Sequence, residues 1–122
     1  MLPLDSLDDA LTKADVTILT LPLTEETCRF INTDRFKTMK NGAVLVNISR
    51  GAIIDTDALI AALNEHLGGA VLDVFDEEPL HENSPLWDMR NVIITPHNSF
   101  VSEGNYARLL DVIMNNLERA EK

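Results

Sequence analysis

Four short apolar runs constrain the fold of this chain more than any other feature. They are rich in Val and Ile, and they cover residues 16–21, 43–48, 69–74 and 91–95. Within each run the apolar residues are nearly continuous and do not alternate with polar ones, which is typical of strands that are buried on both faces. Asp, Gly, Asn or Pro bounds each run, as expected where strands end. The runs therefore predict a buried parallel sheet.

Segments with helical spacing lie between and after these runs. The predicted helices cover residues 32–39, 57–66 and 102–121. The candidate N-caps are Asn32 or Thr33 for the first helix and Asp55 or Thr56 for the second. In the third helix, apolar residues recur every three or four positions: Tyr106, Leu109, Leu110, Ile113, Met114 and Leu117. This helix is therefore amphipathic, and its apolar stripe requires something to cover.

The alternation of strands and helices predicts an α/β fold with a doubly wound parallel sheet and right-handed crossovers. With 122 residues, the chain has room for a single domain, residues 1–122. The one long irregular segment, residues 75–90, follows the third strand. Loops of that length in compact domains are functional or disordered, and its position at a strand end favours function.

Charge and cysteine usage limit the partners of the chain. It has 20 acidic and 10 basic residues, and the net charge of −10 disfavours nucleic acid as a partner. No apolar run approaches the roughly 20 residues that span a bilayer, and residues 1–10 do not resemble a secretory signal, so we expect no membrane insertion. Cys28 has no second cysteine to pair with, which suits a reducing compartment. We expect a cytoplasmic protein.

Polar or charged side chains follow all four predicted strands. In an open α/β sheet, ligands bind beyond the carboxyl ends of the strands, and these ends share one edge. The segments that reach this edge are 21–24 (LPLT), 49–51 (SRG), 76–79 (DEEP) and 95–99 (TPHNS). The candidate site is therefore expected at this edge.

Arg50 is the first candidate in this set. Its guanidinium is a planar, permanently charged fork that can hold a carboxylate in two hydrogen bonds. Gly51, next to it, would allow the backbone to come close. The alternative is that Arg50 only caps a helix or pairs with a surface carboxylate, as most arginines do.

His97 is the second candidate, because imidazole exchanges protons near neutral pH. A lone histidine is more often a surface or structural residue, but a carboxylate from Glu78 could fix its tautomer, provided that the two residues touch. We expect the other histidines, His66 and His81, to be solvated or structural. No His/Cys cluster has the spacing of metal ligands, so no metal is predicted.

The five glycines do not form a phosphate-binding loop. Gly42, Gly51, Gly68, Gly69 and Gly104 never produce the G-x-G-x-x-G turn that presents a helix N-terminus to a pyrophosphate, and no P-loop is present. From the residues alone, the chain is half of an α/β ligand site that presents an arginine, a glutamate and a histidine.

Four segments resemble the successive signatures of the D-isomer-specific 2-hydroxy-acid dehydrogenases, of the phosphoglycerate and glycerate dehydrogenase type. They are 21–27 (LPLTEET), 46–55 (VNISRGAIID), 72–80 (LDVFDEEPL) and 95–99 (TPHNS). They occur in the family's order and close to its spacing, and the resemblance covers nearly the whole chain. It implies a Rossmann-like half-domain, a parallel sheet with flanking helices and a long C-terminal helix. The first, glycine-loop half of the NAD-binding domain and the substrate domain have no counterpart here.

The resemblance also implies roles for single residues. Arg50 would hold the carboxylate and the 2-oxo oxygen of the substrate, His97 would exchange the proton on that oxygen, and Glu78 would orient His97. Asp73 would meet the nicotinamide carboxamide. The wall of the cofactor site would consist of Leu21, Pro22, Thr27, Ile48, Ser49 and Arg50.

The resemblance implies part of an NAD-dependent oxidoreductase that interconverts a 2-oxo and a 2-hydroxy acid, with NADP not excluded as the cofactor. We expect the isolated chain to be inactive. The alternative is a non-catalytic α/β module, derived from such an enzyme, that forms homo-oligomers through a sheet edge and the apolar stripe of the last helix.

Overall fold

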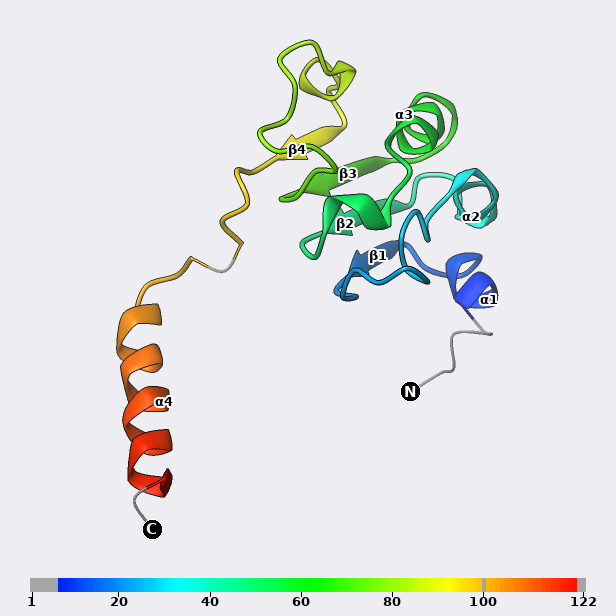
Figure 1. The fold of residues 1–122 in the computed structure, drawn as a ribbon. Helices are drawn as coiled ribbons and strands as arrows, with labels where there is room; N and C mark the ends of the chain where they lie inside the picture. The colour runs from blue at the N-terminus through cyan, green and yellow to red at the C-terminus, as the bar shows by residue number, and fades with distance from the viewer. Residues whose placement is uncertain (1–6, 100, 121–122) are drawn as a thin grey trace.

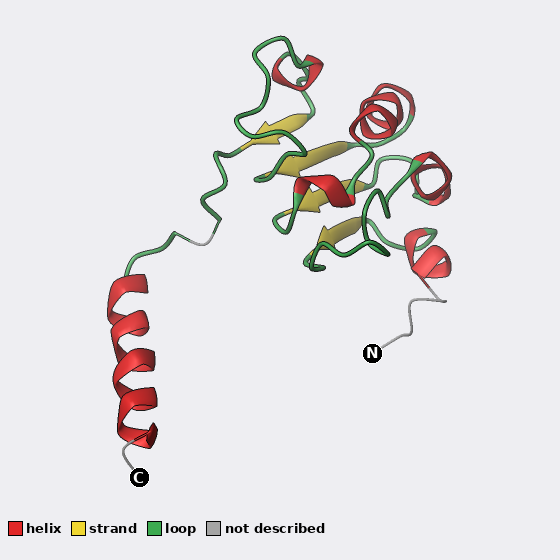
Figure 2. Cartoon of the chain, in the orientation of Figure 1, coloured by secondary structure: helices red, strands yellow, loops and turns green. Residues whose placement is uncertain are grey.

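The structure is a computed structural model that describes residues 7–99 and 101–120. Its centre is a four-stranded parallel sheet (Figures 1 and 2). The strands are β1 (Val16–Leu19), β2 (Val44–Asn47), β3 (Gly69–Leu72) and β4 (Val92–Ile94). They lie in the order β1-β2-β3-β4, and each pair of neighbours is parallel. The predicted parallel sheet is confirmed, with each strand shorter than its apolar run.

The predicted helices are present, and further short ones accompany them. The α-helices are α1 (Leu7–Leu11), α2 (Thr33–Thr38), α3 (Thr56–Glu65) and α4 (Asn105–Ala120), and the 3-10 helices are η2 (Gly51–Ile53) and η3 (Pro85–Trp87). The Asn32 side chain caps α2 by accepting a hydrogen bond from the Arg35 amide (3.2 Å). Asp55 caps α3 in the same way, accepting from the Ala58 amide (3.1 Å). Of the two candidates predicted for each cap, the structure therefore selects Asn32 for α2 and Asp55 for α3.

The core lies between the sheet and the helices α1, α2 and α3, which line up along one side of it (Figure 1). Phe36 from α2, Leu59 from α3 and Leu45 from β2 are each at most 1% exposed. Each crossover leads to the next strand in the same direction across the sheet. Right-handed crossovers that advance in one direction place all their helices on the same face.

The opposite face of the sheet is open, and we call it the bare sheet face. Ile18, Val46, Val71 and Ile93 face one another across the four strands on this side. Ile18 is 58% exposed and Ile93 61% exposed. The expectation that both faces are covered, as in a doubly wound sheet, is therefore wrong for the described residues. The reason is that their crossovers never reverse direction.

Helix α4 lies apart from the sheet (Figure 1). Its apolar stripe, predicted from the sequence, is present, and the described side chains from Tyr106 to Arg119 are all exposed. Leu110 and Ile113, on this stripe, are 48% and 44% exposed. None of the described helices is both long and apolar enough to cross a membrane.

Candidate active site

The turn after β2 presents Arg50 at the carboxyl edge of the sheet, and buried Asn47 holds this turn. Asn47 is fully buried. Its Nδ2 donates to the Arg50 carbonyl (2.9 Å), while its Oδ1 accepts from the Ser49 amide (3.1 Å) and hydroxyl (2.9 Å). Sequence reasoning missed Asn47, although a polar residue inside an apolar run is a signal of a specific hydrogen-bonded role.

The Arg50 side chain is exposed and has no carboxylate at ion-pair distance among the described residues. Its Nη1 donates only to the Ser49 carbonyl (2.6 Å). It borders a hollow of about 500 Å³ that is lined by Thr20, Leu21, Pro22, Leu23, Ile48, Ser49 and Arg50. Five of the residues expected at the cofactor therefore lie together around this hollow. Thr27 does not line it, and its hydroxyl donates to the Pro22 carbonyl (2.7 Å), which closes the neighbouring turn.

Gly51 joins the loop after β2 to the loop after β3 by direct backbone contact. A Cβ atom on Gly51 would lie 1.8 Å from the carbonyl carbon of Phe75 and 2.2 Å from the nitrogen of Asp76. The group that comes close to the Gly51 backbone is the chain's own loop, and a close approach to a ligand stays a prediction. The Arg50 turn and the Glu78 loop are thus fixed against each other.

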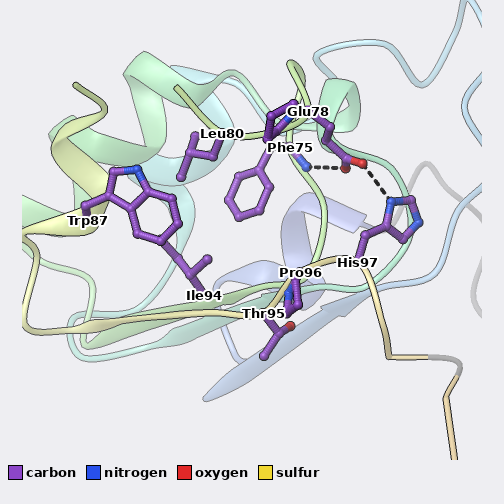
Figure 3. Close-up of a pocket in the computed structure, with 9 residues that line it drawn as sticks. Phe75, Glu78, Leu80, Trp87, Ile94, Thr95, Pro96 and His97 are labelled. Carbon is purple, nitrogen blue, oxygen red and sulfur yellow. Dashed lines mark hydrogen bonds and ion pairs between the residues drawn. The ribbon is translucent and has the colours of Figure 1, made fainter. Parts of the chain in front are cut away.

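Glu78 and His97 form a pair between the loops after β3 and β4 (Figure 3). His97 Nδ1 lies 2.8 Å from Glu78 Oε2. Because a carboxylate only accepts, Nδ1 is the donor, and Nε2 faces away from the apolar side chains in this view. The Phe75 amide donates to Glu78 Oε1 (2.9 Å). The hydrogen bonds from His97 and then from Phe75 lower the pKa of Glu78 below its ordinary value, so Glu78 is charged at neutral pH.

An apolar pocket of about 510 Å³ lies beside the Glu78–His97 pair. Phe75, Leu80, Trp87 and Ile94 form most of its wall, and the pair closes one end (Figure 3). The Trp87 indole NH donates to the His81 carbonyl (3.0 Å), which links η3 to the loop before it. Sequence reasoning missed this pocket, since its wall forms only when segments distant in sequence come together.

Asp73 is a buried carboxylate directly after β3, with 1% of its surface exposed. Its Oδ1 accepts from the Thr95 hydroxyl (2.5 Å) and the Asn98 amide (2.9 Å), and its Oδ2 accepts from the Ser99 amide (2.8 Å). Burial by itself raises the pKa of Asp73, but these hydrogen bonds outweigh burial and hold the pKa far below its ordinary value. Asp73 is therefore charged, and its predicted contact with a nicotinamide carboxamide stays a prediction.

The other two histidines lie outside this arrangement. His66 Nε2 is 3.0 Å from the Phe36 carbonyl, which ties the end of α3 to α2. His81 is exposed and its Nδ1 accepts from the Asn83 amide (3.2 Å). Both are structural or solvated, as expected. Over residues 7–99 and 101–120, no cluster of His, Cys, Asp or Glu could hold a metal ion.

The parallel sheet, with Arg50, Glu78 and His97 in the loops at its carboxyl edge, places the chain among the α/β folds that bind ligands at this edge. Residues 1–99 match the family described as "D-isomer specific 2-hydroxyacid dehydrogenase, NAD binding domain". The chain belongs to this family.

Similar proteins include both enzymes and solved structures. A glyoxylate reductase from Pyrococcus horikoshii is 44% identical over 112 residues, which cover 91% of this chain and 33% of that protein. A D-isomer specific 2-hydroxyacid dehydrogenase family protein from Aeromonas salmonicida superposes with a TM-score of 0.85 at 42% identity, covering 95% of this chain and 37% of that one. A D-isomer specific 2-hydroxyacid dehydrogenase from Xanthobacter autotrophicus, in complex with NADPH and MES, has a TM-score of 0.75 at 44% identity, covering 77% and 31%. The chain therefore spans about a third of the length of these relatives.

Proposed function

We propose that residues 1–122 are the second half of the dinucleotide-binding domain of an NAD(P)-dependent 2-hydroxy-acid dehydrogenase. The observation that carries this proposal is the 2.8 Å contact between His97 Nδ1 and Glu78 Oε2 at the carboxyl edge of the sheet. It supplies an oriented proton donor and acceptor, which the interconversion of a 2-oxo and a 2-hydroxy acid requires. The reaction adds or removes a hydride at the substrate carbon and a proton at its oxygen.

Three residues have separate roles in this proposal. His97 Nε2 gives the proton to the substrate oxygen, or takes it in the reverse direction. Glu78 holds the ring by its Nδ1 and stabilises the positive charge that the ring carries when both nitrogens are protonated. Arg50, which has no carboxylate partner within the described residues, binds the substrate carboxylate and stabilises negative charge on the reacting oxygen.

The hollow beside Arg50 suits part of a dinucleotide. Leu23 and Ile48 are 45% and 41% exposed there, and such apolar side chains can pack against the flat rings of an adenosine or a nicotinamide. Leu21, Pro22 and Ser49 complete the wall, and Thr27 shapes it through its bond to Pro22. Asp73 is a charged acceptor at the same edge of the sheet, and it is the group that would meet the NH₂ of a nicotinamide carboxamide. A bound nicotinamide supplies or accepts the hydride.

A chimera tests this proposal directly. The chain replaces the matching segment of the P. horikoshii glyoxylate reductase, which supplies the remaining two thirds of an enzyme. We expect the chimera to oxidise NADH or NADPH when glyoxylate is added. The isolated chain is expected to show neither turnover nor saturable NADH binding by calorimetry. A folded chimera without turnover would contradict the proposal.

In this chimera, Arg50→Gln is expected to lower kcat/KM for glyoxylate about 10- to 100-fold, because one or two charge-assisted hydrogen bonds to the substrate are lost. Steady-state kinetics at varied glyoxylate concentration measure the effect. Arg90→Gln is the matched control, since Arg90 is also exposed but does not line the hollow. Equal kinetics for the two variants would remove Arg50 from substrate binding.

A second candidate function is a homo-oligomeric module, and two features support it. The bare sheet face and the apolar stripe of α4 are both exposed in one chain. In a pair of copies, the stripe of one copy could cover the bare sheet face of the other. We propose a symmetric dimer in which α4 of each copy packs on the bare sheet face of its partner.

Light scattering on the purified chain tests this dimer. Ile113→Lys on the stripe and Ile18→Lys on the bare sheet face are each expected to raise the dimer dissociation constant at least about tenfold, because a charge would be buried without a partner. Asn115→Lys, on the opposite side of α4, is the control and should have no effect. A wild-type chain that stays monomeric at high concentration would refute the dimer, and an effect of Ile113→Lys alone would refute the docking onto the sheet.

We also propose a cytoplasmic location, which the exposed, unpaired thiol of Cys28 supports. Cell fractionation with an antibody to the chain measures this location. Recovery in an oxidising, exported fraction would contradict it.

A further inference from the structure

The backbone of His97 has a conformation that needs support from its surroundings. Its φ angle is 51°, in the left-handed region that non-glycine residues rarely adopt. The His97 side chain is 42% exposed, so packing alone does not hold the ring in place. The position of its Nδ1 next to Glu78 therefore depends on what fixes the backbone around residue 97.

Asp73 makes hydrogen bonds on both sides of His97. The Thr95 hydroxyl precedes His97 in the chain, and the amides of Asn98 and Ser99 follow it, and all three donate to the Asp73 carboxylate. Asp73 itself follows β3 and is almost completely buried, so it is part of the rigid sheet edge. The segment that carries His97 is thus attached to the sheet at three points by one side chain.

We propose that Asp73 is a positioning residue that holds residues 95–99 in the conformation that brings His97 Nδ1 to Glu78. The catalytic importance of this role rests on the proposed function. The positioning of His97 by Asp73 does not, because it can be measured without turnover. Asp73 acts through the backbone and needs no contact with the substrate. This role is additional to the predicted contact of Asp73 with a carboxamide.

The chemistry of the carboxylate explains why an aspartate is needed here. Two oxygens can accept from donors that approach on both sides, as Oδ1 and Oδ2 do. In Asp73→Asn, one of these oxygens becomes an NH₂ group, which would face a backbone N–H or a hydroxyl. At least one of the three bonds is then lost, while the size of the side chain is unchanged.

NMR spectroscopy of the full 122-residue chain tests this inference. In Asp73→Asn, we expect the Asn98 or Ser99 amide to exchange with solvent about tenfold faster or more, as the loss of a bond to a charged group predicts. The ¹⁵N shifts of the His97 ring report whether Nδ1 carries the proton. In alkaline buffer the wild-type ring is expected to be protonated mainly at Nδ1, and the variant is expected to lose this preference.

Asp55→Asn is the matched control, because Asp55 also accepts from a backbone amide, at the start of α3, and Asn is an equally good cap there. It should change neither the exchange nor the His97 ring shifts. A folded Asp73→Asn chain with unchanged ring shifts would overturn the inference, and so would unchanged exchange of both amides. A purely structural role would lower the unfolding temperature without affecting the tautomer of His97.

A second pair of variants decides the case in which Asp73→Asn does not fold. Thr95→Val removes one donor to Oδ1 and leaves the carboxylate in place, whereas Thr95→Ser keeps the hydroxyl. We expect the ¹⁵N shifts of the His97 ring in Thr95→Val to show less protonation at Nδ1 than in the wild type. In Thr95→Ser, these shifts should match those of the wild type. Identical ring signals in both variants would overturn the inference. An inactive chimera whose isolated chain shows the expected ring shifts would reject the proposed function alone.

Discussion

Replacement of His97 by asparagine is expected to lower kcat of the glyoxylate reductase chimera by about 10²- to 10⁴-fold, the usual contribution of general acid–base catalysis. Asparagine suits this test because it tolerates the left-handed conformation that His97 adopts, at φ 51°. The variant therefore loses the imidazole without a new backbone strain. Affinity for NADH should change little, because the hollow assigned to the cofactor does not include His97.

Stopped-flow and steady-state kinetics would measure the loss in kcat, and fluorescence titration would measure NADH affinity. His81→Asn is the control, since His81 is an exposed histidine of the long loop and should have normal kinetics when replaced. A His97→Asn chimera with wild-type kcat would exclude His97 as the proton donor. A parallel loss of NADH affinity would indicate instead that His97 contributes to the cofactor site.

Gly51→Ala is expected to destabilise the chain by about 3 kcal/mol or more, the upper part of the range for overpacked sites. The added Cβ would lie 1.8 Å from the Phe75 carbonyl carbon, and backbone cannot move aside as a flexible side chain can. The loops after β2 and β3 would have to separate. Chemical denaturation followed by circular dichroism measures the change in the free energy of unfolding.

Gly42→Asn provides the comparison for Gly51→Ala. Gly42 has a φ angle of 80°, and a Cβ atom added there would meet no other atom within 4 Å. Asparagine is among the residues that adopt such angles most readily, so we expect a loss below about 1 kcal/mol. Equal stabilities for the two variants would mean that the loop contact at Gly51 relaxes easily.

The sequence predicted the sheet, and it limited the cap of α2 to Asn32 or Thr33 and the cap of α3 to Asp55 or Thr56, because these features depend on local patterns. The apolar runs of Val and Ile marked each strand, and the side chains of Asn32 and Asp55 cap helices through residues three positions away. The sequence also predicted that Glu78 and His97 reach the same edge of the sheet, since both follow strands whose carboxyl ends share it, but it could not show that the two side chains touch.

Other features depend on tertiary structure and could not be predicted in this way. A continuous apolar run predicts burial on both faces, but Ile18 and Ile93 are exposed because no described crossover covers that side. The bonds of Asp73 to the amides of Asn98 and Ser99 join residues more than 20 positions apart, and no spacing rule connects them. The short helix α1 has too few residues to produce a periodic pattern.

The strand order β1-β2-β3-β4 is also the order in which a ribosome produces these strands. Each new strand joins the edge left by the one before it, so none has to be inserted between two strands that are already paired. Glu78 follows β3 and His97 follows β4, and their contact therefore has to wait until β4 has been synthesised. During translation, the described strands can join the sheet one after another, and the histidine–carboxylate pair forms only after all four of them are in place.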